Sequence, residues 1–515
     1  MLTYRADFWK TPEGTAGLTA MSVGMLTHLY GLVTELHNYD SITVQPAGYG
    51  TGVTSGRWFL SLTGDLVNKL GGNYNVFAVN GIVFILLLAV SACFLVNVFG
   101  LRSRLSAALM GALMVVFPPV TSTMFFRYTA GYYGLAILLA VLAVWVLPRY
   151  KFGLLLSALC TACSLGIYQA YVPLTIGIFV LLLIRQAVWK ETDLWGVVRR
   201  GLYDCLALGL GMVLYFLLMN LTLKLYGTAL SDYQGVGEMG KLALGDVPGL
   251  VWQAFSSFLL MPIKDYCGLA HTKLLKLLYL ALAGITFVGM AYLLLVKNRK
   301  PLMAAAACVL CLLFPVAVNF VVIMCPDSWI YTLMVYGFVL VPCVPLVLLD
   351  GEAFTEEAMS GWKALLKKAA VLTVAAITAC YAYGANVNYT ALYYSNRQVE
   401  NYLNSIVVQV RMTEGFDTEK EWAFLGEIDD PLLFNYWMEE PLYGGSNPAH
   451  KLMNKYSRNW WIQNLYGYSI PSADSAECES LAAREEVKAM PCWPDAGSIK
   501  VVEDFVVIKF QELAP

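Results

Sequence analysis

An acid and an arginine flank a polar stretch near the start of the chain. Asp40 follows the first long apolar segment, and Arg57 stands between Gly56 and Trp58 at the far end of the stretch. A carboxylate can accept a proton from a hydroxyl, and a guanidinium can bind a phosphate through paired hydrogen bonds. The two residues therefore suit chemistry on a lipid-anchored phosphate. The structural alternative is that Asp40 caps a turn and that Arg57 extends toward the lipid headgroups.

Two further cations lie at the ends of apolar segments. Arg127 follows a segment interrupted by Pro118 and Pro119, and Lys264 follows a short apolar run enclosed by prolines. Charged side chains are costly at membrane depth, so they commonly mark a ligand, a pathway or a partner charge. We take both cations as candidate phosphate-binding residues. The alternative is a structural role, such as an ion pair between Lys264 and Asp265.

Residues around a tight hairpin provide candidate sugar contacts. Tyr168 and Gln169 shortly precede Pro173, and their side chains can hydrogen-bond either a saccharide or the hairpin backbone. Trp58, beside Arg57, is taken with them as a substrate-binding candidate. The sequence has no GxSxG, Walker or HExxH motif and no spacing typical of metal ligands. We therefore expect neither a metal site nor a cofactor, with a divalent metal as the unsupported alternative.

The elements that carry these residues must be membrane helices. Of the 515 residues, 58% are hydrophobic and 14% are charged, whereas about a quarter would be charged in a soluble protein. The apolar residues come in runs long enough to cross a bilayer, which takes about 20 residues each. The formal net charge of −2 gives no basis for binding nucleic acid. The composition predicts an all-α polytopic membrane protein.

We expect about 11 transmembrane helices of this length. They are 15–36, 76–99, 105–125, 130–147, 152–168, 172–188, 203–224, 274–296, 302–324, 329–349 and 365–383. Short basic connections alternate with longer, aromatic and Gly-bearing ones, and the positive-inside rule places the basic set in the cytoplasm. The run 248–262 is too short to cross, so we expect a helix in the outer interface. An odd number of spans puts the C-terminal end outside.

The chain is predicted to form two domains. Residues 1–385 form a transmembrane catalytic domain with outer loops 37–75 and 225–273. Residues 386–515 are more polar and form a small α/β extracytoplasmic domain.

Periodicity within the second domain predicts its elements. An entry helix has apolar residues at helical spacing, and strand-like runs occupy 422–428 and 505–510, with a helical stretch near 452–465. The apolar stripe of the entry helix comprises Val399, Leu403, Ile406 and Val410. In an extracytoplasmic compartment we expect a disulfide between Cys478 and Cys492.

Several of these features together resemble the GtrII-type bacterial glucosyltransferases. They are Asp40 in the first outer loop, the Gly- and Ser-rich stretch ending Gly56-Arg57-Trp58, Phe117-Pro118-Pro119, Tyr168-Gln169, and the helix-then-strand polar tail. The resemblance implies a GT-C-like architecture with catalysis at the outer face of the bacterial cytoplasmic membrane. The family often has two adjacent acids in this loop, whereas Asp40 lies between Tyr39 and Ser41.

The resemblance also implies the reaction. A hexose, glucose in this family, is transferred from a polyprenyl-phosphate donor to a cell-surface glycan. Asp40 would act as general base in a single inverting displacement, and Arg57, Arg127 and Lys264 would bind the phosphate. The partners implied are the lipid-linked donor, the glycan acceptor and the bilayer, without nucleic acid. The oligomeric state, the sugar and the acceptor are not specified by the sequence.

Two other functions fit a polytopic chain. A transporter or flippase of lipid-linked sugars would carry charged or broken helices near the midplane and paired halves, which the sequence does not show. A non-catalytic scaffold would bind envelope polymer through its outer domain. Only the enzyme would cleave the bond between the sugar and the phosphate.

Overall fold

The computed structural model describes residues 7–44, 48–72, 75–189, 191–231, 245–297, 300–326, 329–351, 361–428, 443–467 and 469–513. The chain divides into two compact units. Unit 1 comprises Met1–Thr34, Pro46–Asn386 and Leu442–Gly444. Unit 2 comprises Glu35–Gln45, Val387–Pro441 and Gly445–Pro515. Helix α15 (Trp362–Met412) runs without interruption through the boundary at Asn386.

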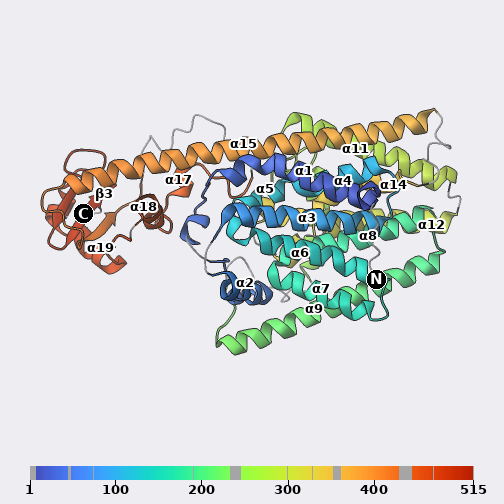
Figure 1. The fold of residues 1–515 in the computed structure, drawn as a ribbon, viewed down its shortest axis with the longest axis horizontal. Helices are drawn as coiled ribbons and strands as arrows, with labels where there is room; N and C mark the ends of the chain where they lie inside the picture. Colours follow the sequence, from blue (N-terminus) through green and yellow to red (C-terminus); the bar gives the residue numbers. More distant parts are fainter. Residues whose placement is uncertain are drawn as a thin grey trace. The chain divides into compact units, whose positions relative to one another are not determined.

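Unit 1 is built from helices (Figure 1). Before α15 they are α1 (Pro12–Val33), α2 (Trp58–Gly71), α3 (Phe77–Phe99), α4 (Arg104–Val116), α5 (Pro118–Met124), α6 (Arg127–Val146), α7 (Gly153–Ile167), α8 (Val172–Trp189), α9 (Leu194–Tyr226), α10 (Val247–Leu260), α11 (Lys273–Tyr292), α12 (Pro301–Val318), α13 (Val321–Met324) and α14 (Leu340–Leu348). Short helical turns connect several of them, among them η3 (Val53–Ser55), η4 (Gln169–Tyr171) and η8 (Tyr336–Val339).

Most of the predicted spans correspond to these helices. Among the described residues, 9 helices are long and apolar enough to cross a membrane. Two further predicted spans appear as shorter apolar helices, Gly153–Ile167 and Tyr336–Leu348. The total of about 11 therefore stays a prediction. The helix expected at 248–262 is present as α10, and its position in the outer interface also stays a prediction.

Small residues allow the first helices to pack closely. A Cβ atom on Gly17 of α1 would lie 2.5 Å from the Cys93 sulfur of α3, and one on Gly24 would lie 2.7 Å from a methyl group of Ile85. On α4, a Cβ atom at Gly111 would lie 2.3 Å from the Ala16 carbonyl oxygen. Helices in membranes associate largely through such close backbone approach. These glycines therefore fix the packing of α1 against α3 and α4.

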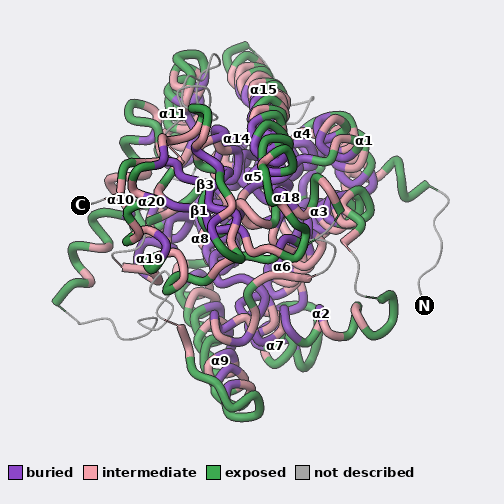
Figure 2. The backbone as a smooth tube through the Cα atoms, turned by 90° about the vertical axis from the view of Figure 1, so that its left-hand side faces the viewer, coloured by how far each residue is buried: buried purple, intermediate pink, exposed green. Residues whose placement is uncertain are grey.

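The helices of unit 1 differ in how far their residues are buried. All residues of α5 are buried, whereas α9 buries only a narrow stripe and α10 buries only Ala254 (Figure 2). Pro118 stands at the first position of α5, where its missing N–H costs nothing, and Phe117 separates α5 from α4. The predicted span 105–125 is thus broken at its prolines, and α5 lies in the interior of unit 1.

Unit 2 combines the C-terminal part of α15 with a small sheet. Its strands are β1 (Glu421–Leu425), β2 (Ile499–Val502) and β3 (Phe505–Lys509), in the order β1-β3-β2. Strand β3 pairs parallel with β1 and antiparallel with β2. The helices of this unit are α17 (Ala449–Leu452), α18 (Arg458–Tyr466), α19 (Ser475–Ala482) and α20 (Glu485–Lys488).

The core of unit 2 agrees with the periodicity of the sequence. The four residues of the predicted stripe, Val399, Leu403, Ile406 and Val410, are fully buried. Strand β3 falls within the predicted run 505–510, and β1 overlaps the run 422–428 but begins one residue before it. Helix α18 overlaps the predicted helical stretch. The helix is longer than expected, because α15 joins the last predicted span and the entry helix into one element of 51 residues.

The expected disulfide is wrong. Cys478 and Cys492 are both free thiols. Cys478 packs beside the apolar core formed by α19 and the sheet. The Cys492 sulfur instead lies 3.6 Å from a carboxylate oxygen of Glu512. Each thiol therefore has a local environment of its own.

Candidate functional site

The loop that carries Asp40 is fixed by side-chain hydrogen bonds. The Asn38 Oδ1 atom accepts from the backbone N–H groups of Asp40 and Ser41, at 3.0 and 2.7 Å. The backbone N–H and carbonyl of His37 both bond to the Asn396 amide on α15, each at 2.8 Å. This double contact lies within unit 2 and holds the loop on the helix. Asp40 thus belongs to unit 2, although it directly follows the first helix of unit 1.

The Asp40 carboxylate has an unusual electrostatic environment. The residue is partly buried, and among the described residues its carboxylate forms no hydrogen bond or ion pair. Burial raises the pKa of this carboxyl from 3.8 to about 6. A carboxylate with a pKa close to the working pH is well suited to general-base catalysis.

Arg57 lies in unit 1 at the start of α2. It follows Gly56, which adopts a left-handed conformation with φ of 70°. A Cβ atom at this position would also lie 2.6 Å from the Tyr215 hydroxyl, so glycine is needed there for two reasons. Helix α2 then begins at Trp58 without a side-chain cap. The N-terminus of α2, which is the positive end of the helix dipole, therefore lies next to Arg57.

Tyrosines surround the Arg57 guanidinium. It lies over the Tyr168 ring, 4.9 Å from the ring centroid, and Nη1 donates to the Tyr133 hydroxyl at 3.3 Å. The Tyr133 and Tyr168 rings are stacked, with centroids 4.5 Å apart. No carboxylate of a described residue pairs with Arg57, and its buried Nε atom has no hydrogen-bond partner. A partly buried cation without a counter-ion favours an anionic ligand.

Gln169 ties the Arg57 loop to α9. Its amide nitrogen donates to the Ser55 carbonyl at 2.9 Å and contacts the Tyr215 hydroxyl at 3.1 Å. Tyr215 in turn donates to the Gly56 carbonyl at 3.2 Å. All of these groups are buried, so each bond replaces one that water would otherwise supply. Gln169 therefore positions the Arg57 loop and does not bond to the backbone of its own hairpin through this amide nitrogen. Its contact with a sugar stays a prediction.

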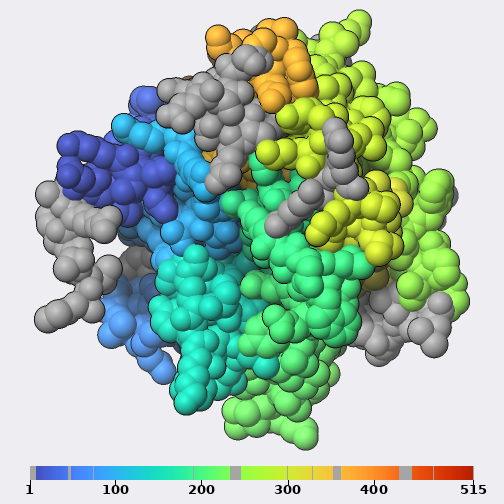
Figure 3. All heavy atoms as spheres, turned by 90° about the vertical axis from the view of Figure 1, so that its right-hand side faces the viewer, coloured from blue at the N-terminus to red at the C-terminus, as the bar shows by residue number. Residues whose placement is uncertain are grey.

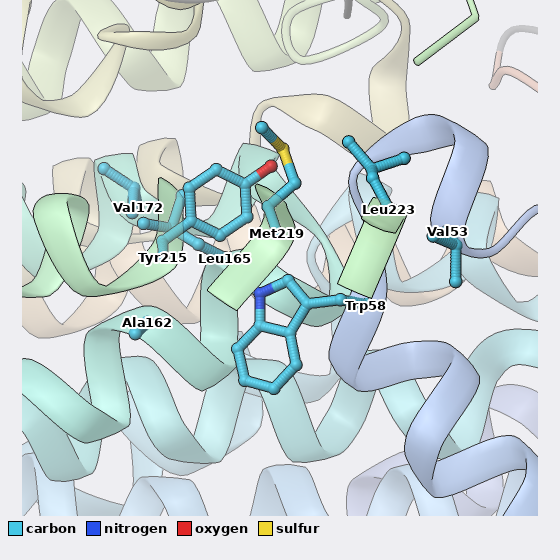
Figure 4. Packing of buried hydrophobic residues seen from close by; sticks show 8 residues of the cluster. All are labelled: Val53, Trp58, Ala162, Leu165, Val172, Tyr215, Met219 and Leu223. Carbon is cyan, nitrogen blue, oxygen red and sulfur yellow. The ribbon is translucent and has the colours of Figure 1, made fainter. Parts of the chain in front are cut away.

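Trp58 completes the packing of this region. It is buried with Val53, Leu165, Met219 and other residues of α7 and α9 (Figure 4). The indole lies against Gly166, where a Cβ atom would come within 2.6 Å of the ring. Its buried N–H group has no hydrogen-bond partner among the described residues. Trp58 thus anchors the start of α2 against α7.

Arg127 has a different environment. Its guanidinium donates to the carbonyl oxygens of Gly31 and Thr34 at the end of α1. It also lies over the Phe77 ring, 4.9 Å from the centroid. A cation at this position satisfies carbonyl groups that a helix end leaves without partners. In this structure the Arg127 side chain therefore caps the C-terminal end of α1.

Lys264 follows α10 and is exposed. The expected pairing with Asp265 does not form, because the Asp265 carboxylate accepts from the backbone N–H groups of Gly268 and Ala270, at 3.0 and 2.7 Å. Asp265 therefore shapes its own loop. Lys264 has no ion-pair partner among the residues that the structure describes.

Four of the seven sequence-predicted residues thus lie together in unit 1. They are Arg57, Trp58, Tyr168 and Gln169. Tyr133 and Tyr215 complete the cluster, and the sequence analysis missed both because tyrosines inside apolar helices are usually packing residues. Within the described ranges, no three His, Cys, Asp or Glu side chains gather as metal ligands would.

The apolar helices of unit 1 are those of a multi-pass membrane protein. A family model described as Glucosyl transferase GtrII matches residues 29–342, more than half of the chain and a range that includes every candidate residue named above. The chain belongs to the GtrII glucosyltransferase family. No curated protein and no solved structure matches it. Membership of the family indicates a glycosyltransferase, and hence a sugar donor and a glycan acceptor.

Proposed function

We propose that the protein transfers a hexose, with glucose as the first candidate, from a polyprenyl-phosphate donor to a cell-surface glycan. The family supports glucosyl transfer, and the apolar helices support a lipid-borne donor. The observation that carries the donor class is Arg57, a partly buried cation among tyrosines without a carboxylate partner in the described part of the chain. A phosphate supplies the negative charge that this environment lacks.

The chemistry needs one base and one phosphate-binding group. We assign the base to Asp40, which would remove the proton from the acceptor hydroxyl. The hydroxyl oxygen would then form a bond to C1 of the donor sugar while the bond from C1 to the phosphate oxygen breaks. Polyprenyl phosphate leaves with the bonding electrons, and Arg57 stabilises its charge. A single displacement of this kind inverts the configuration at C1.

The other predicted residues are assigned by their contacts. Tyr168 holds the Arg57 guanidinium, and Gln169 and Trp58 hold the loop and helix that carry it. Arg127, whose donors bond to the end of α1, acts as a positioning residue. Lys264 is exposed and is the second candidate for contact with the donor phosphate. The proposed location is the cytoplasmic membrane of a bacterium, with the reaction at its outer face.

The test is a donor-cleavage assay with the purified, reconstituted protein. Polyprenyl-phosphate glucose and a glycan acceptor are supplied, and release of polyprenyl phosphate is measured. Arg57→Ala is expected to raise the KM for the donor about tenfold or more, since charge-assisted hydrogen bonds to phosphate contribute about 1.5–3 kcal/mol. Arg149→Ala is the matched control, because Arg149 also lies over an aromatic ring, at 4.8 Å from the Trp145 centroid, outside this cluster.

Three results would contradict the proposal. Sugar that crosses the membrane while still attached to its lipid, with no polyprenyl phosphate released, would identify a flippase. Donor cleavage with an unchanged KM in Arg57→Ala would remove Arg57 from the donor site. Absence of both cleavage and transport, with binding of envelope polymer retained, would identify a scaffold.

A further inference from the structure

A cavity of about 680 Å³ opens between the end of α8 and the start of α9. Its lining includes Gln186 at the end of α8 and Arg199, Arg200, Tyr203 and Leu206 on α9. The cluster around Arg57 lies toward the other ends of these two helices, because Trp58 packs with Val172, the first residue of α8, and with Leu223 near the end of α9. Figure 3 looks onto the right-hand side of the molecule in Figure 1, where segments from teal to green, α7 to α9, occupy much of the lower half.

The cavity has an excess of positive charge. Among the described residues that line it, Glu191 alone carries a carboxylate, and this carboxylate is already paired with Arg185 at 3.2 Å. Arg200 donates through Nε to Asp204 at 2.7 Å. Arg199 is exposed and has no hydrogen bond or ion pair among the described residues. Because the acids are paired locally, the charge of Arg199 is left without compensation.

One wall of the cavity is apolar and exposed. Leu202 and Leu206 are 64% and 49% exposed on the same helix that carries the arginines. Trp195, two turns before Leu202 on the same helix, is 67% exposed, as is typical of aromatic residues at a membrane interface. These side chains are poorly suited to contact with water. They fit contact with lipid acyl chains.

The length of α9 places the cavity at headgroup depth. The helix has 33 residues, and at 1.5 Å per residue it is about 50 Å long, whereas the hydrocarbon core is about 30 Å thick. The predicted span begins at residue 203 and leaves Arg199 and Arg200 in the connection before it, yet both lie within the first turns of α9. Because arginine side chains favour the membrane interface, we assign the excess length of α9 to the end of the helix that carries Arg199 and Arg200.

We propose that this cavity binds the headgroup of an anionic phospholipid. Arg199 contacts the phosphate, with the Tyr203 hydroxyl as a neighbouring donor, and the acyl chains lie along Leu202 and Leu206. The Arg199–Arg200 segment is one of the basic segments that the positive-inside rule assigns to the cytoplasm, where the leaflet carries anionic lipid. A free phosphate ion would share the contact with Arg199 but not the apolar wall. The assignment does not depend on the proposed transfer reaction.

The test compares lipid binding in the full-length protein. Wild type is reconstituted in nanodiscs of phosphatidylcholine alone and of phosphatidylcholine with phosphatidylglycerol in equal parts. Retained lipid is counted by native mass spectrometry, and thermal unfolding is measured in parallel. Phosphatidylglycerol is expected to be retained and to raise the unfolding temperature. Arg199→Ala should weaken its binding about fivefold, the contribution of about 1 kcal/mol expected for one arginine at an anionic surface.

Controls distinguish a lipid headgroup from free phosphate, and the cavity from the cluster around Arg57. Lys151→Ala removes an exposed cation from another basic connection and should bind phosphatidylglycerol as wild type does. Inorganic phosphate should not replace the lipid in the unfolding assay. Arg57→Ala should bind phosphatidylglycerol normally, so failure of the proposed enzyme function leaves this inference standing. If Arg199→Ala does not fold, Arg199→Gln keeps the side-chain length and tests the charge alone.

Three outcomes would overturn the inference. Equal retention of phosphatidylglycerol and phosphatidylcholine by wild type would show that the cavity does not select anionic headgroups. Unchanged binding in both Arg199 variants would remove Arg199 from the contact. Stabilisation by inorganic phosphate equal to that by the lipid would identify a free-phosphate site instead.

Discussion

The guanidinium of Arg57 lies over the ring of Tyr168, 4.9 Å from its centroid. Residues from the start of α2 and the end of α7 are thereby joined by one contact. A guanidinium that lies over an aromatic ring can still donate hydrogen bonds from its N–H groups to an anion. The contact therefore orients Arg57 without neutralising it.

This relationship predicts different results for two substitutions of Tyr168. Tyr168→Phe keeps the aromatic face and should leave the donor KM close to that of wild type. Tyr168→Leu removes the face and should raise the KM about fivefold, corresponding to about 1 kcal/mol for a partly buried cation–π contact. Steady-state kinetics with polyprenyl-phosphate glucose measure both. Equal KM values for the two variants would show that the ring does not orient the arginine.

Asp40 predicts a dependence on pH. Burial raises the pKa of its carboxyl to about 6, so turnover should fall as the pH decreases through this value and the base becomes protonated. Asp40→Asn should abolish transfer at every pH. An unchanged acidic limb of the pH profile in a variant with residual activity would assign that limb to another group.

The same pKa shift makes a separate prediction for stability. The folded protein binds this proton more tightly than the unfolded chain does, because the pKa rises from 3.8 to about 6 on folding. The negative charge therefore lowers stability as the pH increases from about 4 to 6, and the loss persists above that range. Asp40→Asn should unfold at the same temperature as wild type or higher at neutral pH. A lower unfolding temperature would indicate a stabilising partner for the carboxylate.

Asn396 should control activity through the Asp40 loop. Its amide bonds to both backbone groups of His37, so Asn396→Ala leaves a buried donor and acceptor unpaired. We expect kcat to fall while the donor KM stays close to that of wild type, because Arg57 lies in the other unit. Asn401→Ala, on the exposed side of α15, is the control in the same kinetic assay. A rise in KM alone would contradict this assignment.

Gly166 should be intolerant of a side chain. A Cβ atom there would lie 2.6 Å from the Trp58 ring, so Gly166→Ala must displace the indole and should destabilise the protein by about 1–3 kcal/mol. Gly209→Ala on α9 is the matched control, because no atom lies within 4 Å of its Cβ position. Thermal unfolding in detergent compares the two. Equal unfolding temperatures would show that Trp58 does not pack tightly on α7.

The sequence predicted the helices better than it predicted the contacts between residues that are far apart in the chain. Hydrophobic length predicted the 9 helices of the described residues that are long and apolar enough to cross a membrane, and helical spacing identified the buried stripe from Val399 to Val410. It did not predict that the Asp40 loop belongs to unit 2, because that depends on the contact between His37 and Asn396, which are far apart in the chain. Tyr133 and Tyr215 could not be predicted from the sequence either. A tyrosine in an apolar run that contacts a cation has the same sequence pattern as one that only packs against other helices.

The pairing of Asn396 with His37 also bears on which parts of the chain are dispensable. The family match ends at residue 342, so Asn396 lies outside it, while Asp40 lies inside. The matched region thus contains the acid but not the side chain that fixes the acid's loop. A version shortened after residue 342 would retain Arg57 with its tyrosines but would lose Asn396, and with it the two hydrogen bonds that hold the Asp40 loop. The part of the chain beyond the family match is therefore needed to hold the Asp40 loop in place.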